Sequence, residues 1–348
     1  MNDIKKQSII YHLNQWMQIV RVGENKGRLL IEGRLITDAS LLEILSQSRA
    51  YIRSIRRINL NGGEYFEVKP AGRRLHIPHL HLILFLLTVL TTLFAGAIME
   101  GSNPLKAPLS LVQGIPFSLT LLLILGIHEL GHYRFARKHH VDATLPYFIP
   151  APTIIGTFGA FIKMRQPVRN RRALLEIGAA GPIAGFLIAV PALFIGLSLS
   201  EVVPAAQEGG IQLGESLMMK LATWIVHPGL GEGQDVVLHP VAFAAWIGML
   251  VTMLNLLPIG QLDGGHIAYA LLGKWYKKVA WGALGAILIL SIFSPNWLVW
   301  AALVFFLIRV KHPPIYGSLT KPTRYEISIG VIALVIFVLT FIPVPFRI

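Results

Sequence analysis

Cysteine is absent from this chain of 348 residues. Its absence excludes disulfide bonds, thiol catalysis and zinc sites built from thiolates, and it leaves histidine, aspartate and glutamate as the protein ligands for a transition metal. Charge is also scarce. Charged residues make up 14% of the chain, against roughly 25% in soluble domains, whereas 54% of the residues are hydrophobic. This composition predicts a polytopic membrane protein surrounded by a lipid bilayer.

The positive charge that the chain does carry, a net +13 at neutral pH, follows the loops between apolar runs. Residues 134–138, 163–172 and 274–278 are basic, whereas residues 201–238 hold five acidic residues and one lysine. The positive-inside rule accounts for this alternation without a nucleic-acid partner. We therefore expect no nucleic-acid binding. The expected location is the prokaryotic cell (inner) membrane, with the amino-terminal region in the cytoplasm.

Apolar runs predict the membrane part of the chain. A helix needs about 20 apolar residues to cross the hydrocarbon core. Seven runs approach that length, at about residues 80–99, 115–137, 174–199, 240–257, 278–293, 296–309 and 326–343. The fold class that follows is an all-α membrane bundle of about six to eight transmembrane helices over residues 79–348.

Residues 1–78 have a different composition, with thirteen Lys and Arg against seven Asp and Glu. Asp38 can cap a helix through residues 41–45, and a turn signal at 61–63 precedes the strand-like residues 65–68. We expect a small soluble α+β domain here, on the cytoplasmic side. The three histidines at its boundary could bind a metal, but amphipathic residues that flank a span are the favoured interpretation; they are His76, His79 and His81.

Residues 128–132 read His-Glu-Leu-Gly-His and end an apolar run that begins at Ile115. Two histidines at i and i+4 share one face of a helix and can chelate zinc, while Glu129 takes the proton of a metal-activated water. An ionisable residue costs roughly 2.5–3.5 kcal/mol at the bilayer centre on insertion scales, so its presence needs a chemical reason. A metal site with His128 and His132 as ligands is therefore favoured over a structural cluster.

A third ligand is needed, and acidic residues near the apolar runs are few. Asp263 stands in the segment 255–265, which begins with Asn255, and its predicted depth in the membrane matches that of the two histidines. Its alternative role is helix capping. Glu176 and His266 are the substitutes if Asp263 is not a ligand. Asn255 could donate its amide to a substrate carbonyl or could bridge two helices.

The segment between the second and third spans, residues 144–162, is apolar but interrupted by prolines and glycines. We expect a membrane-dipping β-strand or hairpin, whose edge could pair with an extended peptide. The residues predicted to contact that peptide are Gly156, Thr157, Phe158 and Gly159. A loop that only packs on the rest of the protein is the alternative.

Together these motifs resemble the site-2 protease family of intramembrane zinc metalloproteases. The resemblance covers roughly residues 80–310 and rests on four segments, 128–132, 156–161, 172–182 and 255–265. Many family members carry a PDZ or a CBS domain, for which this chain has no room in its loops or tail. It is closer to PDZ-less members with an added soluble amino-terminal domain.

The resemblance implies a metalloendopeptidase with its catalytic core at about residues 110–275. It implies one Zn²⁺ per chain bound by His128, His132 and Asp263, with Glu129 as the catalytic base and Asn255 as a side chain that positions the substrate. The implied partner is a transmembrane protein, cleaved in regulated intramembrane proteolysis or in the clearance of signal peptides. A membrane metal transporter and a non-catalytic membrane scaffold are the alternatives, and the oligomeric state is not indicated.

Overall fold

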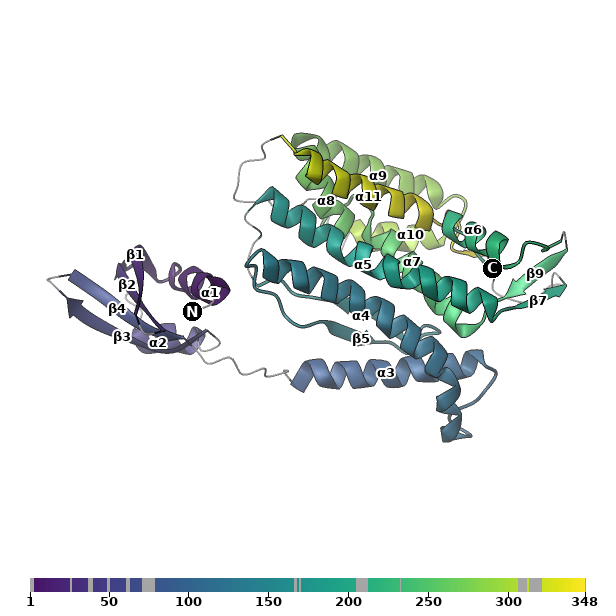
Figure 1. Ribbon diagram of the computed structural model, residues 1–348, viewed down its shortest axis with the longest axis horizontal. Coiled ribbons are helices and arrows are strands. Elements are labelled where there is room, and N and C mark those ends of the chain that lie inside the picture. The colour runs from purple at the N-terminus through teal and green to yellow at the C-terminus, as the bar shows by residue number, and fades with distance from the viewer. Residues whose placement is uncertain are drawn as a thin grey trace. The chain divides into compact units, whose positions relative to one another are not determined.

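The computed structural model describes residues 3–25, 27–36, 40–48, 51–60, 63–70, 79–165, 168, 170–204, 212–231, 233–305, 312 and 321–347. The chain forms two compact units (Figure 1). The smaller unit comprises Met1–Ile77 and Arg137–Asp142, and the larger comprises Pro78–Ala136 and Ala143–Ile348. Each unit has its own hydrophobic core.

The smaller unit is a four-stranded antiparallel sheet with two helices. Its elements are α1 (Asp3–Leu13), β1 (Met17–Asn25), β2 (Arg28–Leu35), α2 (Leu41–Gln47), β3 (Ile52–Leu60) and β4 (Gly63–Pro70), and the strand order is β1-β2-β4-β3. Apolar residues alternate along β2, so that Leu29 and Ile31 lie opposite Val68 and Phe66 and all four are buried. This alternation gives the sheet one apolar face.

The sequence predicted part of this unit. The helix expected at residues 41–45 is α2, and the strand expected at 65–68 lies within β4. Helix α2 is capped by Ser40, whose side chain accepts a hydrogen bond from Glu43 N, and not by the expected Asp38, which lies outside the described residues. The short serine fits the position directly before the helix, where a cap must be placed. Helix α1 was not expected, because its average polarity hides the buried Ile9 and Leu13.

The larger unit is mostly helical. Its elements are α3 (His79–Met99), η1 (Pro108–Gly114), α4 (Ile115–Lys138), β5 (Tyr147–Pro150), β6 (Thr157–Phe161), α5 (Arg171–Ser198), β7 (Glu201–Pro204), β8 (Gln212–Leu213), α6 (Leu217–Val226), β9 (Gln234–Val237), α7 (Pro240–Asn255), α8 (Asp263–Leu272), η2 (Gly273–Trp275), α9 (Tyr276–Leu290), α10 (Asn296–Leu303), α11 (Arg324–Thr340) and β10 (Phe346–Arg347). Helix α5 packs against α7, α8 and α11, and β5 packs against α3 (Figure 1). Helix α5 is therefore central to the unit.

Three of the described helices are long and apolar enough to cross a membrane: His79–Met99, Pro108–Lys138 and Arg171–Ser198. They correspond to the first three predicted spans. The later predicted spans contain shorter helices, α7, α9, α10 and α11, and the 15–17 residues of α7, α9 and α11 cover only about 22–26 Å of a hydrocarbon core of about 30 Å. The predicted helical membrane fold with a small amino-terminal sheet is confirmed at this level, and the number of six to eight spans stays a prediction.

The predicted strand segment forms a hairpin held by the first span. Strands β5 and β6 pair antiparallel, with Tyr147 opposite Phe161. Thr91 Oγ1 on α3 donates to the carbonyl oxygen of Gly156 at 2.6 Å. His81, also on α3, is buried; its ring stacks on Tyr147 with the centroids 3.9 Å apart. His81 is therefore a packing residue, while His76 lies outside the described residues.

Candidate active site

Helix α4 places two imidazoles and a carboxylate on one buried surface. His128, Glu129 and His132 are all buried, and one ligand atom from each can be chosen so that all lie within 4.8 Å of one another. The spacing of four residues puts the two histidines one turn apart on the same face. The apolar residues before them make α4 a membrane-length helix, so this polar surface faces protein and not lipid.

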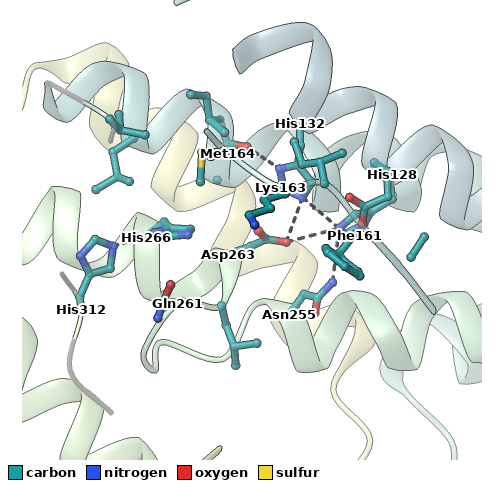
Figure 2. A pocket seen from close by; sticks show the side chains of 18 of the residues that line it. His128, His132, Phe161, Lys163, Met164, Asn255, Gln261, Asp263, His266 and His312 are labelled. Atoms are coloured by element: carbon teal, nitrogen blue, oxygen red, sulfur yellow. Dashed lines mark hydrogen bonds and ion pairs between the residues drawn. The ribbon is translucent and has the colours of Figure 1, made fainter. Parts of the chain in front are cut away.

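Asp263, the first residue of α8, completes a three-donor cluster. The Nε2 atoms of His128 and His132 are 3.1 Å apart, and Oδ2 of Asp263 lies 3.3 Å from the first and 3.2 Å from the second (Figure 2). Two ligand atoms at the usual distance from a tetrahedral zinc ion are about 3.3 Å from each other. The donors therefore fit Zn²⁺ in chemical type and in spacing, and these three residues would hold the ion.

Further contacts orient these donors. Nδ1 of His132 donates to the carbonyl oxygen of Ile177 on α5 at 2.7 Å, which fixes the orientation of the ring with Nε2 on the side of the cluster. Asp263 does not act as a cap, because the N-cap of α8 is Leu262 and makes no side-chain hydrogen bond. Burial works to raise the pKa of Asp263, but the imidazoles of His132 and His128 outweigh it and hold that pKa below its usual range.

Glycines on α5 make room for the two imidazoles. A Cβ at Gly181 would overlap the ring of His132, and a Cβ at Gly185 would lie 3.1 Å from Nδ1 of His128. Gly131 of α4 in turn lies against the backbone of Ala180. The short Ala-Ala-Gly-Pro sequence at 179–182 thus allows α4 and α5 to approach closely, which is the common use of small residues between membrane helices.

The break between α7 and α8 brings the remaining polar groups to the cluster. Asn255 ends α7, and its Nδ2 lies 3.3 Å from Nε2 of His128. Gly260 has a φ of +59°, and a Cβ at Gly264 or Gly265 would overlap the backbone of the turn that precedes α8. These glycines let the chain reverse within a few residues, so that Asp263 returns to the level of Asn255.

The cluster opens into a cavity of about 680 Å³ (Figure 2). Helices α4, α5 and α8 form one part of its wall, and the end of β6 with the residues after it forms another. Glu129 and Ile162, the residue that follows β6, both line this cavity, so the hairpin ends beside the acid. The cavity thus joins a metal-binding cluster to the end of a β-strand.

Of the five residues predicted to bind substrate, Asn255 lines this cavity and the four hairpin residues do not. Gly156 is engaged by Thr91, and the Thr157 hydroxyl donates to the carbonyl of Ile149. Phe158 is 71% exposed, and Gly159 has a φ of +98° with open space beside it. The lining residues come directly afterwards, at 160–165. Sequence reasoning missed them, although they continue the same strand towards the basic loop.

The substitutes for Asp263 have other contacts. Glu176 accepts a hydrogen bond from Nε of Arg172 at 2.6 Å and is not among the residues that line the cavity. His266 does line the cavity, and its Nδ1 lies 2.7 Å from Nε2 of His312, a residue that sequence reasoning missed. At this distance one of the two nitrogens must be deprotonated to accept the hydrogen bond from the other.

Comparison with known proteins agrees with this geometry. The sequence profile of Peptidase family M50 matches residues 116–292, which is half of the chain. The chain belongs to peptidase family M50. The matched residues of this M50 member include the cluster on α4, the glycines of α5, Asn255 and Asp263.

Relatives of this M50 member are named as zinc metalloproteases. A protein named probable zinc metalloprotease EGY2, chloroplastic, from Oryza sativa subsp. indica is 34% identical over 243 residues, which are 68% of this chain and 44% of that protein. The protein of the same name from Arabidopsis thaliana is also 34% identical, over 68% of this chain and 43% of its own length. Probable zinc metalloprotease EGY1, chloroplastic, from Arabidopsis thaliana is 31% identical over 66% and 43%.

The chain therefore spans less than half the length of these relatives. No solved structure matches it. The resemblance to site-2 proteases is confirmed by the M50 match, and the predicted classes of metalloendopeptidase and zinc protein are confirmed at the level of the family.

Proposed function

We propose that this M50 member is an intramembrane zinc metalloprotease that hydrolyses a peptide bond within or near a transmembrane segment of another protein. One observation carries the proposal: a His-Glu-x-x-His cluster on a membrane-length helix meets Asp263 at ligand spacing, in a cavity that also contains the end of a β-strand. The proposed substrate is a class of proteins, because the groups of the site bind a peptide backbone, which every protein has.

In this proposal His128, His132 and Asp263 hold the one Zn²⁺ of the chain. When bound, Zn²⁺ supplies Lewis-acid activation of a water molecule and of the substrate carbonyl. Glu129 follows His128 directly and accepts the proton of that water as general base. The protonated carboxyl then donates the proton to the nitrogen of the leaving amine. Such proton transfer contributes about 10² to 10⁴ in rate.

The hairpin supplies a place for the substrate backbone. A transmembrane helix keeps its carbonyls in internal hydrogen bonds, so its cleavage requires local unwinding. An unwound segment regains hydrogen bonds when it pairs with a strand edge. Because Ile162, directly after β6, lines the same cavity as Glu129, a peptide paired along this strand passes the acid. Asn255, next to His128, donates its amide to a carbonyl of the same peptide.

The proposed orientation of the chain in the membrane follows from the positions of its basic residues. Basic residues Arg134, Arg137 and Lys138 follow the cluster on α4, which puts this end of the helix on the cytoplasmic side of a prokaryotic cell membrane together with residues 1–78. The relatives from plants are named chloroplastic. A protease-protection experiment on inverted vesicles, with a tag on residue 1, tests the orientation.

The Glu129→Gln variant tests the proposed activity. The probe is fluorescently labelled casein, an unfolded protein whose carbonyls need no unwinding, followed by a labelled transmembrane peptide in proteoliposomes. We expect Glu129→Gln to bind zinc at the stoichiometry of wild type and to lose cleavage by at least about 10³-fold, since the variant keeps the ligands and loses the base. Zinc is measured by elemental analysis on the same samples.

The two alternatives give other results. A metal transporter would move zinc into proteoliposomes at the same rate in wild type and in Glu129→Gln, with no cleavage by either. A scaffold would bind the transmembrane peptide without cleaving it. Cleavage that survives in Glu129→Gln would contradict the role of the acid, and cleavage that survives removal of zinc by a chelator would contradict the metal mechanism.

A further inference from the structure

A second pair of imidazoles lines the cavity beyond the metal cluster. His266 lies on α8 one turn after Asp263, and its Nδ1 is 2.7 Å from Nε2 of His312, which comes 46 residues later in the chain. Both side chains belong to the lining of the cavity that holds His128 and His132 (Figure 2). The proposed mechanism uses neither of them.

His266 belongs to the same arrangement on α5 as the metal cluster. Three glycines of that helix, each about one turn from the next, lie against three histidines, so that their missing side chains leave room for imidazoles. A Cβ added at Gly178 would lie 3.0 Å from the Cβ of His266. In the same way, Gly181 lies against His132 and Gly185 lies against His128. The face of α5 that seats the metal cluster therefore also seats His266.

His312 is held in a fixed orientation against α8. Its ring stacks on Tyr269 with the centroids 4.2 Å apart and an interplanar angle of 9°. Tyr276 meets the same ring edge-on, with the centroids 5.9 Å apart. These contacts direct Nε2 of His312 at Nδ1 of His266, and the two rings are nearly perpendicular at 86°. A ring held in this way can set which nitrogen of its neighbour carries the proton.

The free nitrogen of His266 is available to a ligand in the cavity. Among the residues that the structure describes, His266 has no other hydrogen bond than the one to His312. When Nε2 of His312 donates to Nδ1 of His266, the proton of His266 is on Nε2.

We propose that His266 contacts the substrate: its Nε2–H donates a hydrogen bond to a backbone carbonyl of the bound peptide next to the scissile bond. His312 is the positioning residue that fixes the tautomer and the direction of that donor. The inference rests on the proposed peptidase function. A backbone carbonyl is the ligand that fits, since a neutral imidazole offers one directed donor and a peptide offers a carbonyl at every residue.

The test uses the full-length protein in proteoliposomes, with labelled casein as the probe. His266→Phe removes the donor and keeps a ring, His266→Gln keeps an N–H donor, and His312→Phe removes the positioning contact alone. We expect His266→Phe to raise KM about 3- to 10-fold with kcat and zinc content unchanged, as for one lost neutral hydrogen bond. The KM of His266→Gln should stay near that of wild type, and His312→Phe should lie between.

An unchanged KM in His266→Phe would overturn the proposal. A loss of zinc in His266→Phe would also overturn it, because His266 would then belong to the metal cluster. If His266→Phe does not fold, the KM of His312→Phe is compared with that of wild type. An equal KM in the two proteins would overturn the positioning role of His312. If wild type with bound zinc cleaves neither casein nor the transmembrane peptide, the proposed function fails. The affinity of casein for Glu129→Gln with and without His266→Phe still measures the contact.

Discussion

The cavity has two unlike walls. One is helical: α4, α7 and α8 bring histidines, Asn255 and Asp263 against the glycine face of α5, and the polar atoms there lie within about 3 Å of each other. The other is the β5–β6 hairpin, which contacts α3 through the Thr91 hydroxyl and through the rings of His81 and Phe85 on α3. The first wall has the donors of a metal site, and the second has backbone and exposed apolar side chains.

This difference indicates that the helical wall binds the metal and that the hairpin wall binds the substrate. Helix packing against glycines leaves no space for a ligand to shift, which suits a metal site whose donors must stay at fixed distances. A two-stranded hairpin leaves one strand edge for pairing, which suits a peptide of variable sequence. Changes to the helical wall should therefore remove zinc and turnover, whereas changes to the hairpin wall should alter substrate affinity.

The largest effect is expected for Asp263→Ala. The substitution removes one of three donors and leaves two buried imidazoles without their carboxylate, so bound zinc should fall from about one per chain to a small fraction. Cleavage of casein should fall below detection. Elemental analysis and the casein assay on the purified variant measure both. Normal zinc content in Asp263→Ala would mean that His266 or Glu176 is the third ligand. It would contradict the assignment of Asp263 in the helical wall.

A smaller but still large effect is expected for Gly181→Ala. The added Cβ overlaps the ring of His132, which is fixed by its bond to Ile177, so the ring or α5 must move. We expect zinc affinity to fall about 10- to 100-fold, as for other changes next to metal ligands. The matched control is Gly282→Ala on α9, where nothing lies within 4 Å of the added Cβ. Equal zinc affinity in both variants would contradict the close fit of α5.

An intermediate effect is expected for Asn255→Ala. The amide lies at the cluster but is not one of the three donors, so the variant should keep its zinc and lose about 10²-fold in kcat, as when one donor to the substrate carbonyl is removed. The alternative role of Asn255, bridging two helices, makes the opposite prediction. It requires a lower melting temperature with an unchanged kcat. Melting curves and kinetics on one preparation distinguish the two.

The sequence predicted the helical wall better than the hairpin wall, for a physical reason. His128 and His132 are neighbours because of helix periodicity alone, and Asp263 was selected because acids near the apolar runs are few. The contact of His266 with His312 joins positions 46 residues apart and depends on tertiary packing, which no local pattern predicts. The sequence could have predicted Ser40, and not Asp38, as the cap of α2, because Ser40 stands directly before the first residue of the helix.

The hairpin was predicted as a strand, and the structure places residues 160–165 of this segment in the cavity lining, not residues 156–159. The glycines of residues 156–159 indicated a close approach of the backbone to a peptide, and both Gly156 and Gly159 have a positive φ. Their role is local, since Gly156 must pass closely over the backbone of Thr91 on α3. The residues that reach the cavity, 160–165, have no positive φ, and their position depends on how the hairpin packs against α3. That direction is a property of the packed structure.

The smallest effect, expected for Thr91→Val, tests the hairpin wall itself. The substitution keeps the shape of the side chain and removes the donor to Gly156 O. Losing one neutral hydrogen bond should loosen the hairpin and raise KM for casein about threefold, with kcat and zinc content unchanged. The control is Thr120→Val on α4, whose hydroxyl, within the described part of the chain, bonds only to Pro116 of its own helix. A lower zinc content in Thr91→Val would mean that the hairpin supports the metal as well, and the two walls would then act as one.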